Sequence, residues 1–221
     1  MKRVFLLPLL LVLSGCATIV DEATPFTASS PDGLLLLELV DVPADKSAIA
    51  LFDPFICPLP QGARKPDMNA IHGCPRSNIV ESADGKSRFA AYQMPPGRYV
   101  MERLQVQARW AACFNGGTKA FEVAAGKVTY LGALHLAPHV AEIGAATPIV
   151  AYQSSYYTVF DTPRPALDGP DKLPGWQARV GAFMSASMPR VAAPLVAAAP
   201  ESATFETAQG IFDRVCTNAY E

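Results

Sequence analysis

Charge is scarce in this sequence, because charged side chains make up 17% of its residues. The 18 basic and 20 acidic residues nearly cancel and form no basic stripe, so the chain lacks the electrostatic footprint of a nucleic-acid-binding protein. Local catalytic signatures are missing too, since no GxSxG, SxxK, HExxH or P-loop sequence occurs. No CxxC pair is present to suggest a zinc site. We therefore expect no enzyme activity, no catalytic residues, no cofactor, no metal ion and no nucleic-acid partner.

The N-terminal apolar segment is too short to be a permanent membrane span. Val4 to Leu13 follow Lys2 and Arg3 and would form a helix of roughly 15 Å, half of the ~30 Å hydrocarbon core of a bilayer. A positive region, a short apolar region and small residues before a cleavage point are the layout of a secretory signal peptide. The sequence therefore predicts export.

The four residues Leu13-Ser14-Gly15-Cys16 resemble the lipobox of bacterial lipoproteins. The resemblance implies removal of residues 1–15 and a mature N-terminus at Cys16 that carries a diacylglyceryl group and usually a third acyl chain. Two or more chains hold a protein stably on a membrane. Ala17, rather than aspartate, follows the cysteine, which by resemblance to the sorting rule of enteric-type bacteria implies the periplasmic face of the outer membrane. The simpler alternative is a secretory signal with a chance cysteine.

The remaining cysteines predict disulfides. Without Cys16 the chain has four, an even number that is typical of disulfides in an oxidising compartment, and three pairings are possible. Cys57 and Cys74 flank a polar stretch rich in proline and glycine, which a bridge would stabilise by ~3 kcal/mol. We therefore predict Cys57–Cys74 and Cys113–Cys216. A zinc site is the competing interpretation.

The pattern beyond the signal is mainly that of a β protein. Residues 16–32 are small, polar and punctuated by proline, and we expect a lipidated N-terminus followed by a flexible tether. Short apolar or alternating segments then predict strands over 33–40, 47–55, 87–94, 97–110, 118–136 and 147–161. Gly126 suggests that 118–136 folds as a hairpin. Residues 33–162 are therefore expected to form an antiparallel β-sandwich of about seven strands.

The last part of the chain has apolar residues at helical rather than alternating spacing. Residues 174–188 place Trp176, Val180 and Phe183 at helical spacing, and residues 204–218 do the same with Phe205, Ile211, Phe212, Val215 and Cys216. The stretch between them is of low complexity and reads as a linker or loose helix. We predict that 163–221 is a short α-helical appendage that packs on the sandwich, with its end held by Cys113–Cys216.

Several polar groups could bear chemistry, but each has a simpler explanation. His135 and His139 have the spacing of a metal-binding helix, yet Pro138 favours a strand-end and a loop histidine instead. His72 and Cys74 could form a nucleophilic pair, but an oxidised cysteine is inert. The acidic residues Asp161, Asp168 and Asp171 could gather around calcium, although solvated turns explain them more simply.

An aromatic strand face is the best candidate ligand surface. Tyr152, Tyr156 and Phe160 share one face of the last predicted strand and could form a shelf for a sugar or a peptide. Core packing and cross-strand pairing are the simpler explanation.

The segments MPPGRYVMERL and FEVAAGKVTYLGALHL are similar to a motif of uncharacterised bacterial envelope lipoproteins with a transthyretin-like or carboxypeptidase-regulatory-like β-sandwich. The matched part covers about residues 88–136. The resemblance implies the sandwich fold and no catalytic residues. We expect a non-catalytic, membrane-anchored envelope lipoprotein that serves as a structural or protein-interaction module. The alternative is a glycan- or peptide-binding module that uses the tyrosine face.

Overall fold

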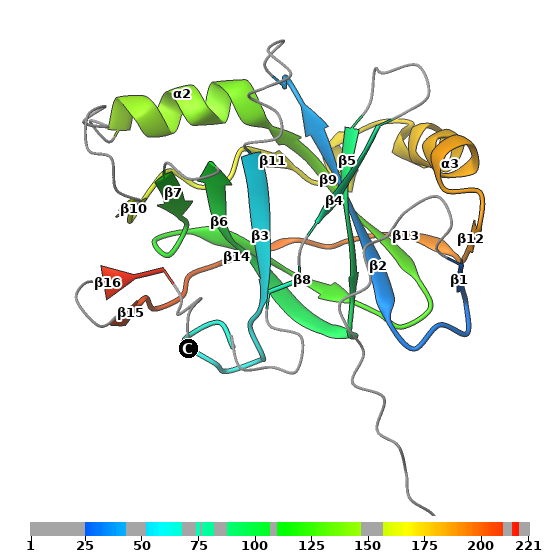
Figure 1. Ribbon diagram of the computed structural model, residues 1–221, viewed down its shortest axis with the longest axis horizontal. Helices are drawn as coiled ribbons and strands as arrows, with labels where there is room; N and C mark the ends of the chain where they lie inside the picture. The colour runs from blue at the N-terminus through cyan, green and yellow to red at the C-terminus, as the bar shows by residue number, and fades with distance from the viewer. Residues whose placement is uncertain are drawn as a thin grey trace, which may run out of the picture.

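The protein is a mainly β structure in which two sheets pack face to face (Figure 1). The structure is a computed structural model that describes residues 25–42, 52–67, 74–75, 77–81, 88–106, 110–146, 157–209 and 214–216. The predicted β-sandwich is confirmed. Its sheets are mixed rather than purely antiparallel, because β2 and β13 run parallel to β9 in one sheet and β10 runs parallel to β7 in the other.

The first sheet, named here the β2 sheet, has the order β11-β9-β2-β5-β4, and β13 pairs with the first half of β9. Its strands are β2 (Gly33–Val40), β4 (Asn78–Glu81), β5 (Arg88–Met94), β9 (Val128–His135), β11 (Leu167–Asp168) and β13 (Leu195–Ala197). The central strand β2 is almost continuously apolar because both of its faces are buried.

The second sheet, named here the β6 sheet, has the order β10-β7-β6-β8-β14, and β3 pairs with the other edge of β6. Its strands are β3 (Phe52–Pro58), β6 (Gly97–Val106), β7 (Trp110–Cys113), β8 (Thr118–Val123), β10 (Tyr157–Val159) and β14 (Glu201–Ala203). Two of the sequence-based boundaries were wrong here. Strand β3 extends to Pro58 rather than ending at residue 55, and the predicted strand 97–110 is the antiparallel pair β6 and β7.

A bulge in β6 explains why simple alternation fails in this strand. The register with β3 shifts so that Phe55 pairs with Arg103 and Ile56 pairs with Met101. Met101 and Leu104 consequently both enter the core between the sheets, while Arg103 lies over the Phe55 ring, 4.1 Å from its centroid. The extra residue in a bulge turns the following side chains to the opposite face. Simple alternation would place Met101 and Arg103 on one face, whereas the bulge places them on opposite faces.

The segment 118–136 is not a hairpin. Strand β8 pairs with β6, whereas β9 pairs with β2, so the turn between β8 and β9 passes from one sheet to the other. Gly126 has the predicted positive φ, of 63°. Its N–H donates to the Asp32 carbonyl at 2.8 Å, and a Cβ atom there would lie 2.1 Å from the Ala28 carbonyl oxygen. This position needs glycine for space as well as for conformation.

Helix α3 (Trp176–Ser187) confirms the first predicted helix and covers the outer face of the β2 sheet. The even-numbered leucines of β2, Leu34 and Leu36, pack against it, while the odd-numbered ones face the other sheet. Phe183 stacks on Phe89 with ring centroids 4.0 Å apart. The β2 sheet is therefore the middle of three layers.

The C-terminal segment is not the predicted second helix. It forms β14 and the small antiparallel pair β15 (Ala208–Gln209) and β16 (Arg214–Val215). Phe205 and Cys216 are buried on the outer face of the β6 sheet, and the Phe205 N–H donates to the Asn115 carbonyl. Tertiary contacts thus take backbone groups that a helix would use internally. Because 163–221 also supplies β11 and β13, it is part of both sheets rather than an appendage.

The last part of the predicted tether belongs to the fold. Strand β1 (Phe26–Thr27) pairs in parallel with β12 (Val191–Ala192), a segment that we expected to be a linker or loose helix. Phe26 is buried in the cluster under α3, and its N–H donates to the Arg190 carbonyl. Residues 16–24 lie outside the described residues.

The described part of the chain also contains helix α2 (Leu136–Ala146) and the 3-10 turn η1 (Pro170–Lys172). Helix α2 begins directly after β9, so His139 is a helical residue and the predicted loop is wrong. Pro138 is tolerated because it is the third residue of the helix, where its missing N–H has no intrahelical acceptor. Figure 1 shows α2 and α3 at different parts of the sandwich.

Candidate functional site

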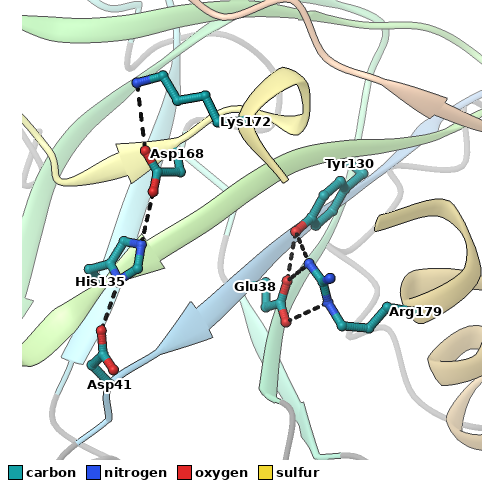
Figure 2. A network of polar contacts seen from close by, with 7 residues as sticks. All are labelled: Glu38, Asp41, Tyr130, His135, Asp168, Lys172 and Arg179. Atoms are coloured by element: carbon teal, nitrogen blue, oxygen red, sulfur yellow. Dashed lines mark hydrogen bonds and ion pairs between the residues drawn. The ribbon is translucent and has the colours of Figure 1, made fainter. Parts of the chain in front are cut away.

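Two polar clusters lie on neighbouring strands of the β2 sheet, and Figure 2 shows both. In the first, the buried Glu38 carboxylate of β2 accepts a hydrogen bond of 2.6 Å from the Tyr130 hydroxyl of β9. Arg179 of α3 donates to the same carboxylate from Nε at 3.2 Å and from Nη2 at 2.9 Å. A charge that is only 7% exposed is thus held by a two-pronged ion pair and a phenol.

This first cluster anchors α3 to the sheet. Burial raises the pKa of Tyr130, and its hydrogen bond to Glu38 raises it further. The hydrogen bond to Glu38 likewise raises the pKa of Arg179. At neutral pH the phenol is therefore protonated and the guanidinium charged. The Trp176 ring stacks on Tyr130 with centroids 5.0 Å apart, so polar and apolar contacts position the same helix.

The second cluster surrounds His135, the last residue of β9. Its Nδ1 lies 2.8 Å from Oδ2 of Asp41, which follows β2, and its Nε2 lies 3.1 Å from Oδ2 of Asp168 in β11. The Lys172 ammonium is 3.6 Å from the other oxygen of Asp168. Hydrogen bonding to Asp41 raises the pKa of His135; Asp168 adds to this rise and partial burial opposes it. The geometry is that of an imidazolium clamped between two carboxylates.

The second cluster can do little chemistry, because both ring nitrogens of His135 already have hydrogen-bond partners. Each ring nitrogen of His135 already faces a carboxylate, so neither is turned toward a reacting group or a metal ion. Within the described chain, one group of three ligating side chains gathers its donor atoms within 4.8 Å, and it consists of Glu102, Cys113 and Cys216. These cysteines are bonded to each other, so their sulfur atoms are not free thiolate ligands.

Both predicted disulfides are present. Cys57 is bonded to Cys74, and Cys113 of β7 is bonded to Cys216. The second bridge is buried in a cluster on the outer face of the β6 sheet and closes a sequence separation of 103 residues. It fixes the end of the chain on the sandwich, as the sequence predicted.

Most of the other predicted site residues are not covered by the structure. Cys16, His72, Tyr152 and Tyr156 lie outside the residues that the structure describes. Phe160 is described, and it packs partly buried against the apolar cluster beside Cys113–Cys216, where core packing accounts for it.

The three acidic candidates for calcium also have separate surroundings. Asp161 accepts a hydrogen bond of 2.6 Å from the Asn115 amide, whereas Asp168 contacts His135. Asp171 is exposed in η1. Asp161 and Asp168 thus bind different partners that are distant in sequence, and the three residues do not form a shared ion site.

A hollow of about 440 Å³ lies on the β6 sheet, between loop 59–63 and β14. Arg98 lines it, donating to the Leu59 carbonyl at 3.2 Å and pairing with Glu201 at 2.7 Å. The Arg98 guanidinium is therefore already paired with a carboxylate, that of Glu201, which lines the same hollow.

The polar clusters escaped sequence reasoning, although one signal was present. Glu38 is the one charged residue of the otherwise apolar segment GLLLLELV, and a charge at such a position requires a buried partner. The partners Tyr130 and Arg179 are far away in sequence, so no spacing reveals them. His135 was correctly placed at a strand end, but nothing local indicates Asp41 or Asp168.

Comparisons of the chain with protein-family models, with curated proteins and with solved structures find no match. None of the helices in the described part of the chain has the length and apolar character needed to cross a bilayer. The functional argument therefore depends on the residues themselves.

Proposed function

We propose that the protein is a lipid-anchored lipoprotein of the bacterial cell envelope, held at the periplasmic face of the outer membrane. The observation that carries this proposal is the pairing of its cysteines. Four of the five cysteines form two disulfides, which leaves Cys16 as the single unpaired cysteine. Disulfides of this kind belong to oxidising compartments. The remaining cysteine stands in a lipobox-like sequence behind a signal-like segment, where acylation gives it a role.

The pairing of β1 with β12 supports a sandwich domain that is held close to the membrane. Cys16 and Phe26 are ten residues apart, and a fully extended chain of that length spans at most about 36 Å. Phe26 is fixed beside β12 at the edge of α3. An acylated Cys16 would therefore keep the β1–β12 corner of the sandwich within about that distance of the lipid surface.

The sandwich itself is proposed to be a non-catalytic structural or protein-interaction module, of the transthyretin-like kind that its PPGRY and AGKVTYLG segments resemble. Its polar clusters support this assignment because their groups bind one another: Glu38 binds Arg179, and His135 binds two aspartates. The alternative is a glycan- or peptide-binding module. It is less supported, because Phe160, the described member of the aromatic face, takes part in packing.

Fatty-acid labelling of Cys16→Ser tests the anchor. The wild-type chain should incorporate the label and begin at Cys16 by mass spectrometry, whereas the variant should carry no label and retain residues 1–15. Ser14→Ala is the matched control, since it changes a neighbouring residue and leaves the acceptor sulfur. Label retained by Cys16→Ser, or an unlabelled wild type, would refute the proposal. Crosslinking of the labelled protein in intact envelopes, followed by mass spectrometry, then identifies a protein partner or a glycan.

A further inference from the structure

The junction between β9 and α2 carries two histidines in opposite environments. His135 ends β9, and His139 lies in the first turns of α2. They are four residues apart in sequence, but one is clamped by carboxylates and the other is buried among apolar groups.

The surroundings of His139 favour its neutral form. Its side chain is 0% exposed, and its ring is tilted against Phe114 with centroids 5.5 Å apart. Within the described chain neither ring nitrogen has a hydrogen-bond partner. The charged group that faces it is Glu142 of the same helix, whose Oε2 lies 3.6 Å from Nδ1 and whose side chain is largely exposed. Burial lowers the pKa of His139, and Glu142 offsets this only in part. Protonation would place an unsolvated cation in an apolar contact.

The surroundings of His135 favour its charged form. The groups that face it are Asp41 at the end of β2 and Asp168 in β11, with Lys172 of η1 behind Asp168. An imidazolium has two N–H donors and satisfies both carboxylates, whereas neutral imidazole has one. Loss of the proton leaves one carboxylate facing a nitrogen lone pair. The clamp therefore weakens when His135 becomes neutral.

Both histidines act on the attachment of α2. The Asp41 carbonyl accepts a hydrogen bond of 3.2 Å from the N–H of Ala137, the second residue of α2, so the His135 clamp also holds the start of the helix. His139 packs the following turn against Phe114. We propose that the β9–α2 junction is a two-sided pH switch, in which α2 is docked while His135 is protonated and His139 is neutral, and is released when either condition fails.

The pH dependence of α2 docking has an acidic limb, set by His139, and an alkaline limb, set by His135. The sign of each follows from which state, docked or released, binds more protons. For His139 the released state binds more protons than the docked state, so docking weakens as the pH falls below about 6.5, the usual histidine value, toward the lowered pKa. For His135 the docked state binds more protons, so its contribution is complete below about 6.5 and is lost as the pH rises through the raised pKa. Within each window the opening equilibrium changes by up to tenfold per pH unit. The alkaline limb should be the shallower one, because His135 is 35% exposed and water screens its clamp.

The test is an NMR titration of the histidine rings in the full mature chain, combined with amide hydrogen exchange across the same pH range. His135 should titrate above and His139 below about 6.5. Exchange protection of 136–146, corrected for intrinsic rates, should be maximal at intermediate pH and fall on both sides, while α3 serves as the internal reference. A His139 that titrates at or above 6.5, or α2 protection that follows α3 at every pH, would overturn the proposal.

Two variants separate the limbs. His139→Leu should abolish the loss of α2 protection at low pH and leave the loss at high pH, and His135→Gln should do the reverse. A His139→Leu protein that still loses α2 protection on acidification contradicts the assignment. Should either variant fail to fold, the wild-type titration and exchange profile decide the question by themselves.

Discussion

Replacing Arg179 with methionine measures how strongly the buried ion pair holds α3 on the β2 sheet. Methionine keeps much of the apolar stem of arginine, so the main loss is the cation that faces Glu38. The carboxylate would remain buried and charged with a single hydrogen bond, from the Tyr130 hydroxyl. The change therefore leaves an unpaired charge rather than a cavity.

The expected cost is about 2–3 kcal/mol of the free energy of unfolding. Breaking a buried ion pair by removing one partner costs ~3–5 kcal/mol. That figure is reduced here because Arg179 is 38% exposed, which lets water reach the carboxylate when the guanidinium is gone, and because Tyr130 still donates. For a domain of this size each kcal/mol lowers the melting temperature by about 2–4 °C, so the fall should be about 4–12 °C.

Urea and thermal denaturation of four proteins complete the measurement: wild type, Glu38→Gln, Arg179→Met and the double variant. The double variant should be less destabilised than the sum of the single ones, by at least about 1 kcal/mol. Arg64→Met is the matched control, because its ion pair with Glu206 has side chains that are 82% and 42% exposed and should contribute less than about 1 kcal/mol. If Arg179→Met costs no more than this control, or the single effects simply add, the anchoring role of the pair is wrong.

Three further outcomes are expected from denaturation and thiol-labelling measurements. Truncation after Ala199 should lower the melting temperature and leave Cys113 reactive to thiol reagents, because it removes Cys216 together with β14; an unchanged melting curve would contradict docking of this segment. Gly126→Ala should destabilise far more than Gly175→Ala in urea, since both residues have positive φ but only the first would force a Cβ against a neighbouring carbonyl; equal costs would contradict this. Phe183→Ala should cost ~3–5 kcal/mol in the same assay, and a cost below about 1 kcal/mol would show that α3 is not packed as described.

The sequence predicted features whose cause is local. The segment 33–40 is β2 to the residue, the helical spacing from Trp176 is α3, and the cysteine count led to both disulfides. These predictions depended on periodicity, on turn chemistry and on compartment. Each of those signals is contained within one short segment or within a simple count.

The errors came from tertiary context. The turn at Gly126 has the local chemistry of a hairpin, but the flanking strands belong to different sheets, and only their partners β2 and β6 decide that. The spacing of Phe205 and Cys216 suits a helix, yet these two residues are buried by a strand-like segment that a distant cysteine and the Asn115 carbonyl hold in place. The bulge in β6 likewise depends on pairing with β3, and it moves Arg103 off the face that simple alternation predicts.

Coverage of the outer faces explains why the segment after residue 162 was misread as an appendage. In an ordinary sandwich the outer face of each sheet is polar, and the strands alternate. Here α3 covers the outer face of the β2 sheet, and the C-terminal segment with Phe205 and Cys216 covers that of the β6 sheet. Between them, β13 and β14 add an edge strand to each sheet in turn, so one continuous stretch ties the two layers together. Strands that are buried on both faces lose their alternation, which is why β2 reads as a plain apolar run. The Cys113–Cys216 bridge then bonds the end of this stretch to β7 of the β6 sheet, beside the buried Phe205.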